Sequence, residues 1–289
     1  MTQSATLDVS RKGLVAHMRD QFSRNDTCLR ELIQNSRRAG ASRVRISYDP
    51  ERQSLSISDD GCGIKQPEDL FLLGHSGFLS NPENLAEERP FGLGFASAMF
   101  AADSIRVATR TFFCNFETAS VLAFEPVHVY DDPEYLFFDG TVVELQLSEA
   151  RAKALGLWED ADATGRLQRC IAEIVAGFPI PVEFNGEEMN RPNAANESFL
   201  DCPDFIDCGD MQIRVDFDNF RRIRFAPRVS MKAKFYYQGL PLDPGAYDPG
   251  NERKNVIVHV GNRFRVRTPD RDSVVDEQRK ELDEVFAAE

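Results

Sequence analysis

The sequence lacks the features that would place the chain at a membrane. No apolar run approaches the roughly 20 residues that cross a bilayer, and the N-terminal stretch MTQSATLDVSRKG has no apolar signal-peptide core. We therefore expect a cytoplasmic protein that makes no membrane contact. A length of 289 residues with a hydrophobic content of 42% is ample for a buried core and for two domains.

Patterns typical of transition-metal sites and disulfides are also missing. The 6 cysteines are scattered without a CxxC pair, and the 4 histidines form no pair at helical spacing. Structural zinc sites and disulfide frameworks need closely spaced ligands or cysteines. The sequence therefore predicts free thiols and no bound transition metal.

Positive charge is scarce over the chain as a whole. The net charge of -13 argues against non-specific nucleic-acid binding by the whole molecule. Residues 211–271 depart from this balance, with 13 Lys/Arg against 6 Asp/Glu. Two interpretations stay open for this region: solvated strand faces, or a basic surface that contacts DNA, another phosphate group or an acidic partner.

What the sequence does contain is an alternation of helical and strand-like patterns. A helix is expected over 25–39, with Asn25 or Asp26 as N-cap and Gly40 at its end. Further helices are expected at about 14–18, 92–102, within 148–177 and at the C-terminus. Strands are expected at 44–49, 55–59, 104–110, 120–130 and 141–147, around an Asn185-Gly186 hairpin turn, and over 211–266.

Two polar side chains share one face of the helix expected over 25–39. Glu31 and Asn35 lie one turn apart in the stretch RELIQNSRRAGA. An amide oxygen can bind a hard cation such as Mg²⁺, and a carboxylate one turn away can hold a water molecule. Taken alone, the pair is better explained as an exposed polar helix face.

Two glycine-containing turns follow along the chain. SISDDGCGI places Asp59 at the end of a strand, and Gly61 and Gly63 leave room for a flat ligand. An ionised aspartate only accepts hydrogen bonds, so it can receive the exocyclic amine of adenine. In RPFGLGFASA, Gly92 and Gly94 open a helix and leave backbone N–H groups for an anion. Each turn alone is weak evidence, because both patterns are common.

In this order, the motifs resemble the GHKL superfamily, which includes the ATPase component of DNA gyrase, the ninety-kilodalton chaperones, sensor histidine kinases, the mismatch-repair ATPases and the MORC proteins. The resemblance covers residues 25–147 and rests on ELIQNSRRAGA, SISDDGCGI, LGHSGF, RPFGLGFASA and GTVVELQL. It implies an α+β fold of the Bergerat type, in which helices cover one face of a mixed, mainly antiparallel sheet. It also implies ATP and Mg²⁺ as ligands.

The resemblance implies roles for the residues of the helix and the first turn. Glu31 matches the general base of the superfamily, and Asn35 matches its magnesium ligand. Asp59 matches the aspartate that binds the adenine amine, with Gly61 and Gly63 shaping the pocket.

The remaining motif residues match parts that surround the phosphates and the adenine. Gly92 and Gly94 match glycines whose amides hold the phosphates, and Thr141 matches a threonine near adenine. Residues 65–91 match the lid that folds over ATP, with Ser76 and Gly77 inside it.

One position departs from the superfamily. Many members carry an aspartate, within the pattern Asn-Ser-x-Asp-Ala, where this chain has Arg38. That aspartate supports the adenine side of the pocket, so the departure leaves the affinity and the pocket detail open.

A second domain is expected after the ATP-binding domain. The sequence predicts an ATP-binding domain over 1–150 and a smaller transducer-like α/β domain over 151–289, with a soft boundary between 150 and 195. NVIVHVGNRFRVRTPDR is similar to the transducer loop of the mismatch-repair ATPases, in which a lysine reaches the γ-phosphate. The nearby cations here are Lys254, Arg263 and Arg265, and none is favoured over the others.

The resemblance implies an ATPase of the conformational-switch type. ATP would close the lid and drive formation of a homodimer that acts on a protein partner or client. One alternative is a nucleotide-sensing interaction module that binds ATP or ADP with little turnover. A protein kinase of the histidine-kinase type is disfavoured, because only about two dozen residues precede the helix that carries Glu31. The last alternative is a set of coincidental turns in an unrelated α/β protein.

Overall fold

The structure is a computed structural model that describes the greater part of the chain. The described residues are 11–21, 26–72, 94–131, 140–155, 162–195, 206–207, 211–215, 233–242, 256–261, 264–266, 273–278 and 280. Their helices are α1 (Arg11–Gln21), α2 (Thr27–Arg38), α3 (Glu68–Phe71), α4 (Gly94–Ala101), α5 (Thr118–Leu122), α6 (Glu149–Ala154) and α7 (Ala163–Val175).

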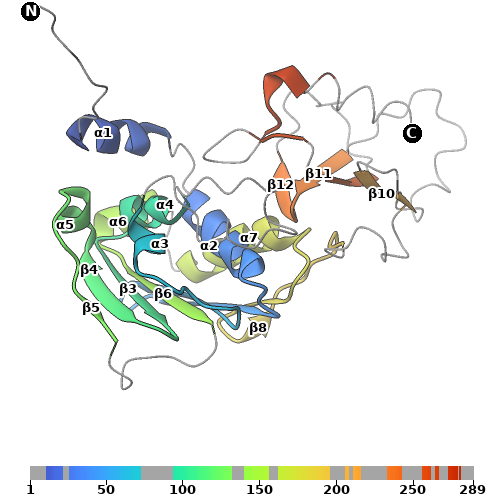
Figure 1. Ribbon diagram of the computed structural model, residues 1–289. Helices are drawn as coiled ribbons and strands as arrows, with labels where there is room; N and C mark the ends of the chain where they lie inside the picture. The colour runs from blue at the N-terminus through green and yellow to red at the C-terminus, as the bar shows by residue number, and fades with distance from the viewer. Residues whose placement is uncertain are drawn as a thin grey trace, which may run out of the picture.

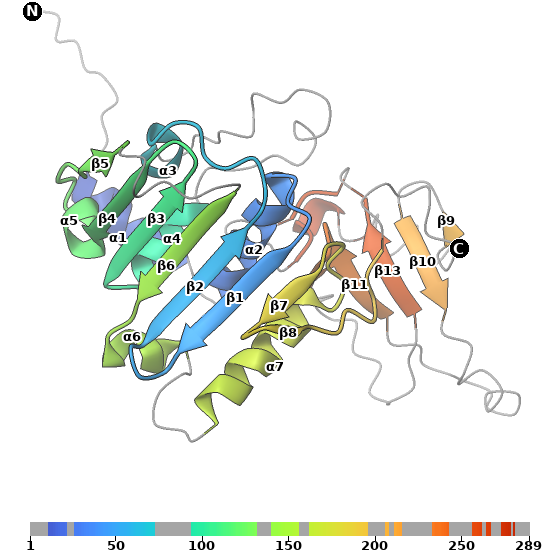
Figure 2. The same cartoon turned by 90° about the horizontal axis from the view of Figure 1, so that it is seen from below.

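The first sheet has eight strands in the order β5-β4-β3-β6-β2-β1-β7-β8. Its strands are β1 (Val44–Asp49), β2 (Ser54–Asp59), β3 (Ser104–Thr109), β4 (Phe113–Glu117), β5 (Val129–Tyr130), β6 (Thr141–Gln146), β7 (Val182–Phe184) and β8 (Glu187–Glu188). Only the β1–β7 pair is parallel. Figures 1 and 2 show the helices on one face of this sheet. The expected mixed, mainly antiparallel sheet with helices on one face is therefore confirmed.

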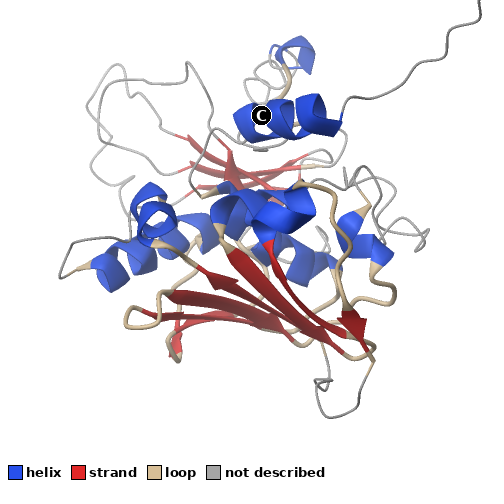
Figure 3. Ribbon diagram, turned by 90° about the vertical axis from the view of Figure 1, so that its left-hand side faces the viewer, coloured by secondary structure: helices blue, strands red, loops and turns tan. Residues whose placement is uncertain are grey.

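The main core lies between this sheet and the helix layer, which Figure 3 shows above the strands. Along β1, Val44, Ile46 and Tyr48 are buried while Arg45 and Ser47 are exposed, as expected for a strand with one covered face. Each aliphatic side chain that becomes fully buried contributes about 1.5–3 kcal/mol. Alternation along the strands therefore fixes which face of the sheet receives the helices.

Helix α2 lies in the middle of this layer and is buried on nearly all sides. Of its 12 residues, 10 are buried, including the polar side chains Arg30, Glu31, Gln34, Ser36 and Arg38. A surface helix buries one stripe, whereas a helix buried all round contacts other elements on several sides. The polar residues of α2 must therefore have partners inside the protein.

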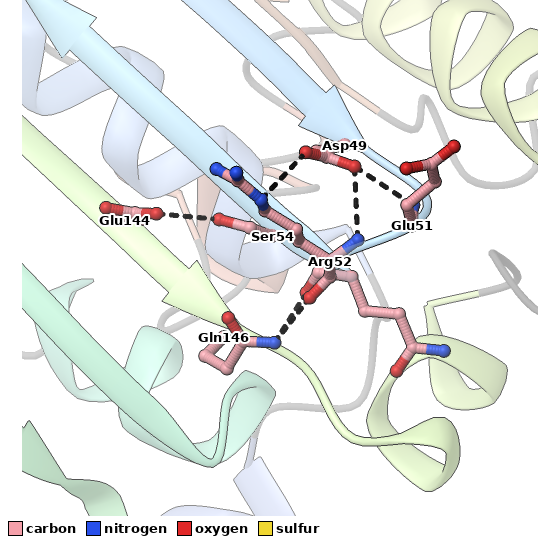
Figure 4. Close-up of polar contacts among 7 residues, drawn as sticks. Asp49, Glu51, Arg52, Ser54, Glu144 and Gln146 are labelled. Carbon is pink, nitrogen blue, oxygen red and sulfur yellow. Dashed lines mark hydrogen bonds and ion pairs between the residues drawn. The ribbon is translucent and has the colours of Figure 1, made fainter.

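The turn between β1 and β2 fixes the register of the central strands (Figure 4). Asp49 accepts a hydrogen bond from the backbone N–H of Arg52 at 3.1 Å, and Gln146 donates to the Arg52 carbonyl at 2.6 Å. Ser54 donates to Glu144 of β6 at 2.9 Å. The same β2–β6 register places Asp59 opposite Thr141 at the other end of the two strands. The contacts at this turn therefore help to determine which residues are paired at that end.

The second sheet has five strands in the order β12-β11-β13-β10-β9. They are β9 (Ile206–Asp207), β10 (Met211–Val215), β11 (Ala233–Tyr237), β12 (Leu240–Leu242) and β13 (Val256–Val260), and only β11 and β13 run parallel. The strands expected over 211–266 are therefore present in the described part of that region. Part of the charged C-terminal segment is helical, at residues 276–278 and 280.

One predicted strand is wrong over most of its length. The sequence pattern predicts an extended segment over 120–130, but α5 occupies Thr118–Leu122, and β5 forms only at Val129–Tyr130. The strand before α5, β4, is absent from the prediction. The Thr118 hydroxyl donates to the carbonyl oxygen of Ala102 at 2.8 Å, which ends β4 and turns the chain. That contact joins residues far apart in sequence, and a local apolar pattern does not contain it.

The change from the first sheet to the second falls after β8. The first sheet ends at Glu188 and the second begins at Ile206. Helix α7 packs in the core of the first sheet through Leu167, Ile171 and Ile174. The division of the chain into two domains stays a prediction, and these strands favour a boundary near residue 195.

Candidate functional site

The carboxylate of Glu31 is enclosed between two helices. Glu31 is 5% exposed and Asn35, one turn later on α2, is half-buried. The interpretation of the pair as an exposed polar helix face is therefore wrong for Glu31. A carboxylate is found inside a protein only where nearby groups compensate the loss of water. This placement favours a functional site.

The start of α4 lies directly against Glu31. A Cβ atom added to Gly94 would clash with Glu31 Oε2, so a larger residue there would force the carboxylate to move. Ser97 stays within its own helix, where its hydroxyl donates to the Gly94 carbonyl at 2.6 Å. The structure thus brings Glu31 and Gly94 together, at the helix end where backbone N–H groups have no partner inside the helix.

Asp59, at the end of β2, is held by three neighbours. Its carboxylate accepts from the Ser36 hydroxyl at 3.0 Å and from the Gly61 N–H at 2.9 Å. Burial raises the pKa of Asp59 above its ordinary value, and the hydrogen bonds from Gly61, Ser36 and the Thr141 backbone oppose that rise. The side chain is therefore fixed in direction and partly removed from water.

The Ser36–Asp59 contact joins α2 to the strand end. Ser36 lies five residues after Glu31, which corresponds to about 7.5 Å along a helix axis. One rigid helix therefore sets the spacing between the Glu31–Gly94 contact and the Asp59 carboxylate. The sequence motifs did not indicate Ser36 as a site residue, although it follows Asn35 directly.

Gly61 and Gly63 permit close packing around Asp59. A Cβ at Gly61 would lie 2.7 Å from the carbonyl oxygen of Ala39, and the N–H of Cys62 donates to that oxygen at 2.8 Å. Gly63 has a φ of +72°, a conformation that glycine adopts without strain. Gly61 thus lets the turn pack against the C-terminal end of α2, and Gly63 leaves room for the Thr109 hydroxyl.

Thr109 anchors the far side of this turn and was not predicted. Its hydroxyl accepts from the Ile64 N–H at 2.9 Å and donates to the Gly140 carbonyl at 3.3 Å. Gly140 has a φ of +100°, and a Cβ there would clash with the Asp59 carbonyl oxygen. The next residue, Thr141, pairs with Asp59 across the β2–β6 ladder. Thr141 therefore lies beside Asp59, and its place near adenine stays a prediction.

Asp60 holds the outer side of the same turn. It accepts from the backbone N–H groups of Ser42 and Arg43 at 2.7 and 3.0 Å, and from the Ser42 hydroxyl. Desolvation by burial tends to raise the pKa of Asp60, but the hydrogen bonds from Ser42 and Arg43 lower it by more. The pKa of Asp60 is therefore below its usual value. Two adjacent aspartates therefore have different roles, one turned toward the site and one toward the loop after α2.

The comparisons with known proteins agree with this arrangement. A family described as histidine kinase-, DNA gyrase B- and HSP90-like ATPase matches residues 23–123. Residues 23–123 are therefore similar to this ATPase family. The GHKL match includes α2, the Asp59 turn and α4, so the resemblance seen in the motifs is confirmed. At the level of the family, it supports ATP binding and hydrolysis.

The relatives of this chain include bacterial chaperones. It is 27% identical over 204 residues to the chaperone protein HtpG of Serratia proteamaculans, covering 58% of this chain and 31% of the relative. The HtpG proteins of Cronobacter sakazakii and Escherichia coli K12 are 28% identical over 204 and 202 residues, each covering 58% of this chain and 30% of the relative. The chain spans about a third of the length of these relatives.

Several predicted site residues lie outside the described residues. These are Ser76 and Gly77 of the expected lid, Gly92 of the expected phosphate-binding turn, and the cations Lys254 and Arg263. Their roles stay predictions.

The described part of the second half contains Arg265, the third cation. Arg265 is exposed, and its backbone N–H donates to the Gln278 side chain at 2.7 Å. Neither observation connects its guanidinium to the Glu31 site. The choice of a γ-phosphate cation therefore stays a prediction, as does contact of the basic region 211–271 with DNA or another phosphate.

The remaining outcomes concern thiols and membrane contact. Cys28, Cys62, Cys114 and Cys170 are free thiols, and burial raises the pKa of Cys28 and of Cys114 to about 12. Both buried thiols are therefore poor nucleophiles at neutral pH. Among the described residues, no helix is long and apolar enough to cross a membrane.

Proposed function

We propose that this GHKL domain binds ATP with Mg²⁺ and hydrolyses it. The observation that carries the proposal is the enclosure of the Glu31 carboxylate against Gly94, on the same helix that holds Asp59 through Ser36. A nucleotide-binding site without hydrolysis needs the Asp59 end alone. A buried carboxylate beside the expected phosphate end is a feature that hydrolysis requires.

Each part of the site has a chemical task in this proposal. The ionised Asp59 accepts a hydrogen bond from the adenine amine, and the backbone at Gly94 faces the phosphates. Glu31 orients the attacking water and accepts its proton as the water oxygen bonds to the γ-phosphorus and the bond to the bridging oxygen breaks, releasing ADP and phosphate. The Asn35 amide oxygen would hold Mg²⁺, and the half-buried position of Asn35 one turn from Glu31 fits that task. The bound ion would supply charge neutralisation for the phosphate oxygens.

Hydrolysis would serve a conformational switch. We propose that residues 65–91 close over bound ATP and that closure drives formation of a homodimer. The relatives are named chaperone proteins, which supports a protein partner or client in the cytoplasm as the target of the switch. A nucleotide-sensing module that binds ATP without turnover is the second candidate, and the Asp59 pocket alone would satisfy it.

The proposal is tested by phosphate release from ATP by the full chain. We expect turnover that requires Mg²⁺ and stops when EDTA is added in excess. Tight ATP binding with no phosphate release above the buffer control would leave the sensing module as the function.

Substituting Gly94 by alanine is expected to lower turnover about a hundredfold, because small displacements of a catalytic group cost rates of this order. The new Cβ would clash with Glu31 Oε2, so the carboxylate must move. Alanine is the better helix residue, and α4 should therefore still form. Phosphate-release rates and thermal unfolding are measured together. Full turnover by a folded Gly94→Ala protein would contradict the placement of Glu31.

The exposed thiol of Cys62 offers a test of the Asp59 pocket that does not depend on turnover. Cys62 lies between Gly61 and Gly63, next to the proposed adenine site. Bound nucleotide should slow its alkylation at least roughly fivefold at saturating ATP, since a covered thiol reacts only while the site is empty. Mass spectrometry after timed alkylation measures the rate. Equal rates with and without Mg-ATP would place the adenine elsewhere.

A further inference from the structure

The turn between β11 and β12 contacts the helix that carries Glu31. The side-chain amides of Gln34 on α2 and Gln238 in this turn lie 2.7 Å apart. Gln34 is 0% exposed, so its amide depends on partners within the protein. The contact joins residues 204 positions apart and links the two sheets.

Arginines of α2 surround this amide pair. With Gln34 Nε2 as the donor to Gln238 Oε1, Arg38 also approaches that oxygen, at 3.4 Å. With the Gln34 amide turned over, its oxygen accepts from two nitrogens of Arg37 at 2.8 and 3.1 Å and still faces Gln238. That orientation brings two amide oxygens together, so Gln34 and Gln238 pair in it when the Gln238 amide is turned over as well and donates to Gln34. The Arg38 position, where the superfamily often has aspartate, lies at this contact between the sheets.

A second contact joins α2 to the same hairpin. Arg30 is 6% exposed; it donates to the Pro241 carbonyl of β12 at 3.1 Å and pairs with Asp26 at 2.7 Å. Arg30 and Gln34 flank Glu31 in the sequence. The β11–β12 hairpin thus contacts α2 on both sides of the catalytic position.

The hairpin itself is firmly seated. A Cβ at Gly239 would lie 2.7 Å from Pro179, and Leu240 belongs to the core of the first sheet. Gly177 lies against the Tyr236 ring, where a Cβ would clash. Gln238 has a φ of +52°, a left-handed conformation that is uncommon for glutamine. A rigid turn therefore presents the Gln238 side chain to α2.

We propose that Gln238 is a positioning residue that couples the second sheet to the ATPase site. Through Gln34 it holds α2 in the position that places Glu31 against Gly94. A shift of the second sheet would therefore move Glu31, and loss of the contact would slow hydrolysis while leaving the Asp59 pocket intact. This inference rests on the proposed ATPase function and adds a route by which the second half of the chain controls it.

The test replaces Gln238 by asparagine in the full chain. Asparagine tolerates the left-handed turn but is one methylene too short to reach Gln34. We expect kcat for ATP to fall about tenfold, the size of effect typical of coupling residues, with the Kd for ATP changed less than about twofold. In Gln238→Glu the new side chain has the same length and its carboxylate lies near the arginines of α2, so this variant should retain at least half of the wild-type kcat. A Gln34→Met, Gln238→Asn double variant should be no slower than the slower single variant.

Lys234 provides the matched control, because it lies on β11 and is exposed. Lys234→Ala should leave kcat and Kd unchanged. A Gln238→Asn protein with wild-type kcat would overturn the coupling. A parallel loss of kcat and ATP affinity would also overturn it, because that result indicates general loosening of the fold.

Deuterium exchange distinguishes failure of this inference from failure of the proposed function. Saturating Mg-ATP should slow exchange in both α2 and the hairpin 233–242 of the wild type, and only in α2 of Gln238→Asn. Protection of α2 alone in the wild type would overturn the coupling but keep ATP binding. Protection of neither element would refute the ATP site itself, and the inference with it.

Discussion

Replacing Glu31 by alanine is expected to abolish ATP turnover and to leave ATP binding in place. A positioned general base contributes about 10²–10⁴-fold to a hydrolytic rate, so kcat should fall by that factor. The side chain lies at the Gly94 contact, away from Asp59, and adenine recognition should therefore survive. Phosphate release gives kcat, and equilibrium titration gives the Kd for ATP.

Glu31→Gln is the matched control for this experiment, since it keeps the volume that fills the space at Gly94 and removes only the basic group. Both variants should lose turnover to a similar degree. If Glu31→Gln retained wild-type turnover, Glu31 would act through packing and could not be the base.

Replacing Asp59 by asparagine is expected to remove ATP binding. The substitution takes away a charged acceptor and leaves an amide donor facing the adenine amine, a loss of about 3–4 kcal/mol or roughly 10²–10³-fold in Kd. The fold should persist, because asparagine still accepts from Gly61 and can donate to the Ser36 hydroxyl. Titration with ATP and thermal unfolding of the same samples test the two statements together.

The pKa of Asp59 adds a pH dependence to this result. Burial raises that pKa above its ordinary value, so wild-type ATP affinity should weaken as the pH falls through the raised pKa and the acceptor is protonated. The native state binds the Asp59 proton more tightly than the unfolded state. The free energy of unfolding should therefore fall as the pH rises from the ordinary pKa of aspartate to the raised pKa of Asp59. The Asp59→Asn protein should not show this part of the pH dependence. A pH-independent ATP affinity across that range would contradict an ionised acceptor.

Local sequence patterns were sufficient for the parts of the site that lie within single elements. Glu31 and Asn35 are one helical turn apart, and Asp59 ends a strand whose alternation is visible in SLSISD. The family resemblance named Thr141 as a residue near adenine, but its pairing with Asp59 joins strands separated by a long segment and was not predicted.

Contacts between distant segments could not be predicted in this way. Nothing near Ser36 or Thr109 in the sequence indicates that their hydroxyls hold the turn around Asp59. Gly140 is part of a motif shared with the superfamily, but the close approach of its backbone to Asp59 depends on the folded sheet. The Gln34–Gln238 contact requires both sheets to be in place.

The buried polar face of α2 illustrates the same limit. The pattern around Leu29, Leu32 and Ile33 predicts a helix with one apolar face, and that face is in the core. The alternative of an exposed polar face is wrong for Glu31, because α4 covers it, and Arg38 is likewise buried, at the β11–β12 hairpin. Propensity and periodicity describe one helix, whereas burial depends on what packs against it.

Thermal unfolding in the presence of nucleotide tests the ATP site most directly. Mg-ATP at about 100 times its Kd should stabilise the wild-type chain by about 2.7 kcal/mol, which corresponds to a rise in Tm of several degrees. The Asp59→Asn protein should show no rise at the same concentration. An unchanged Tm for the wild type under saturating Mg-ATP would contradict an ATP site built from α2, the Asp59 turn and α4.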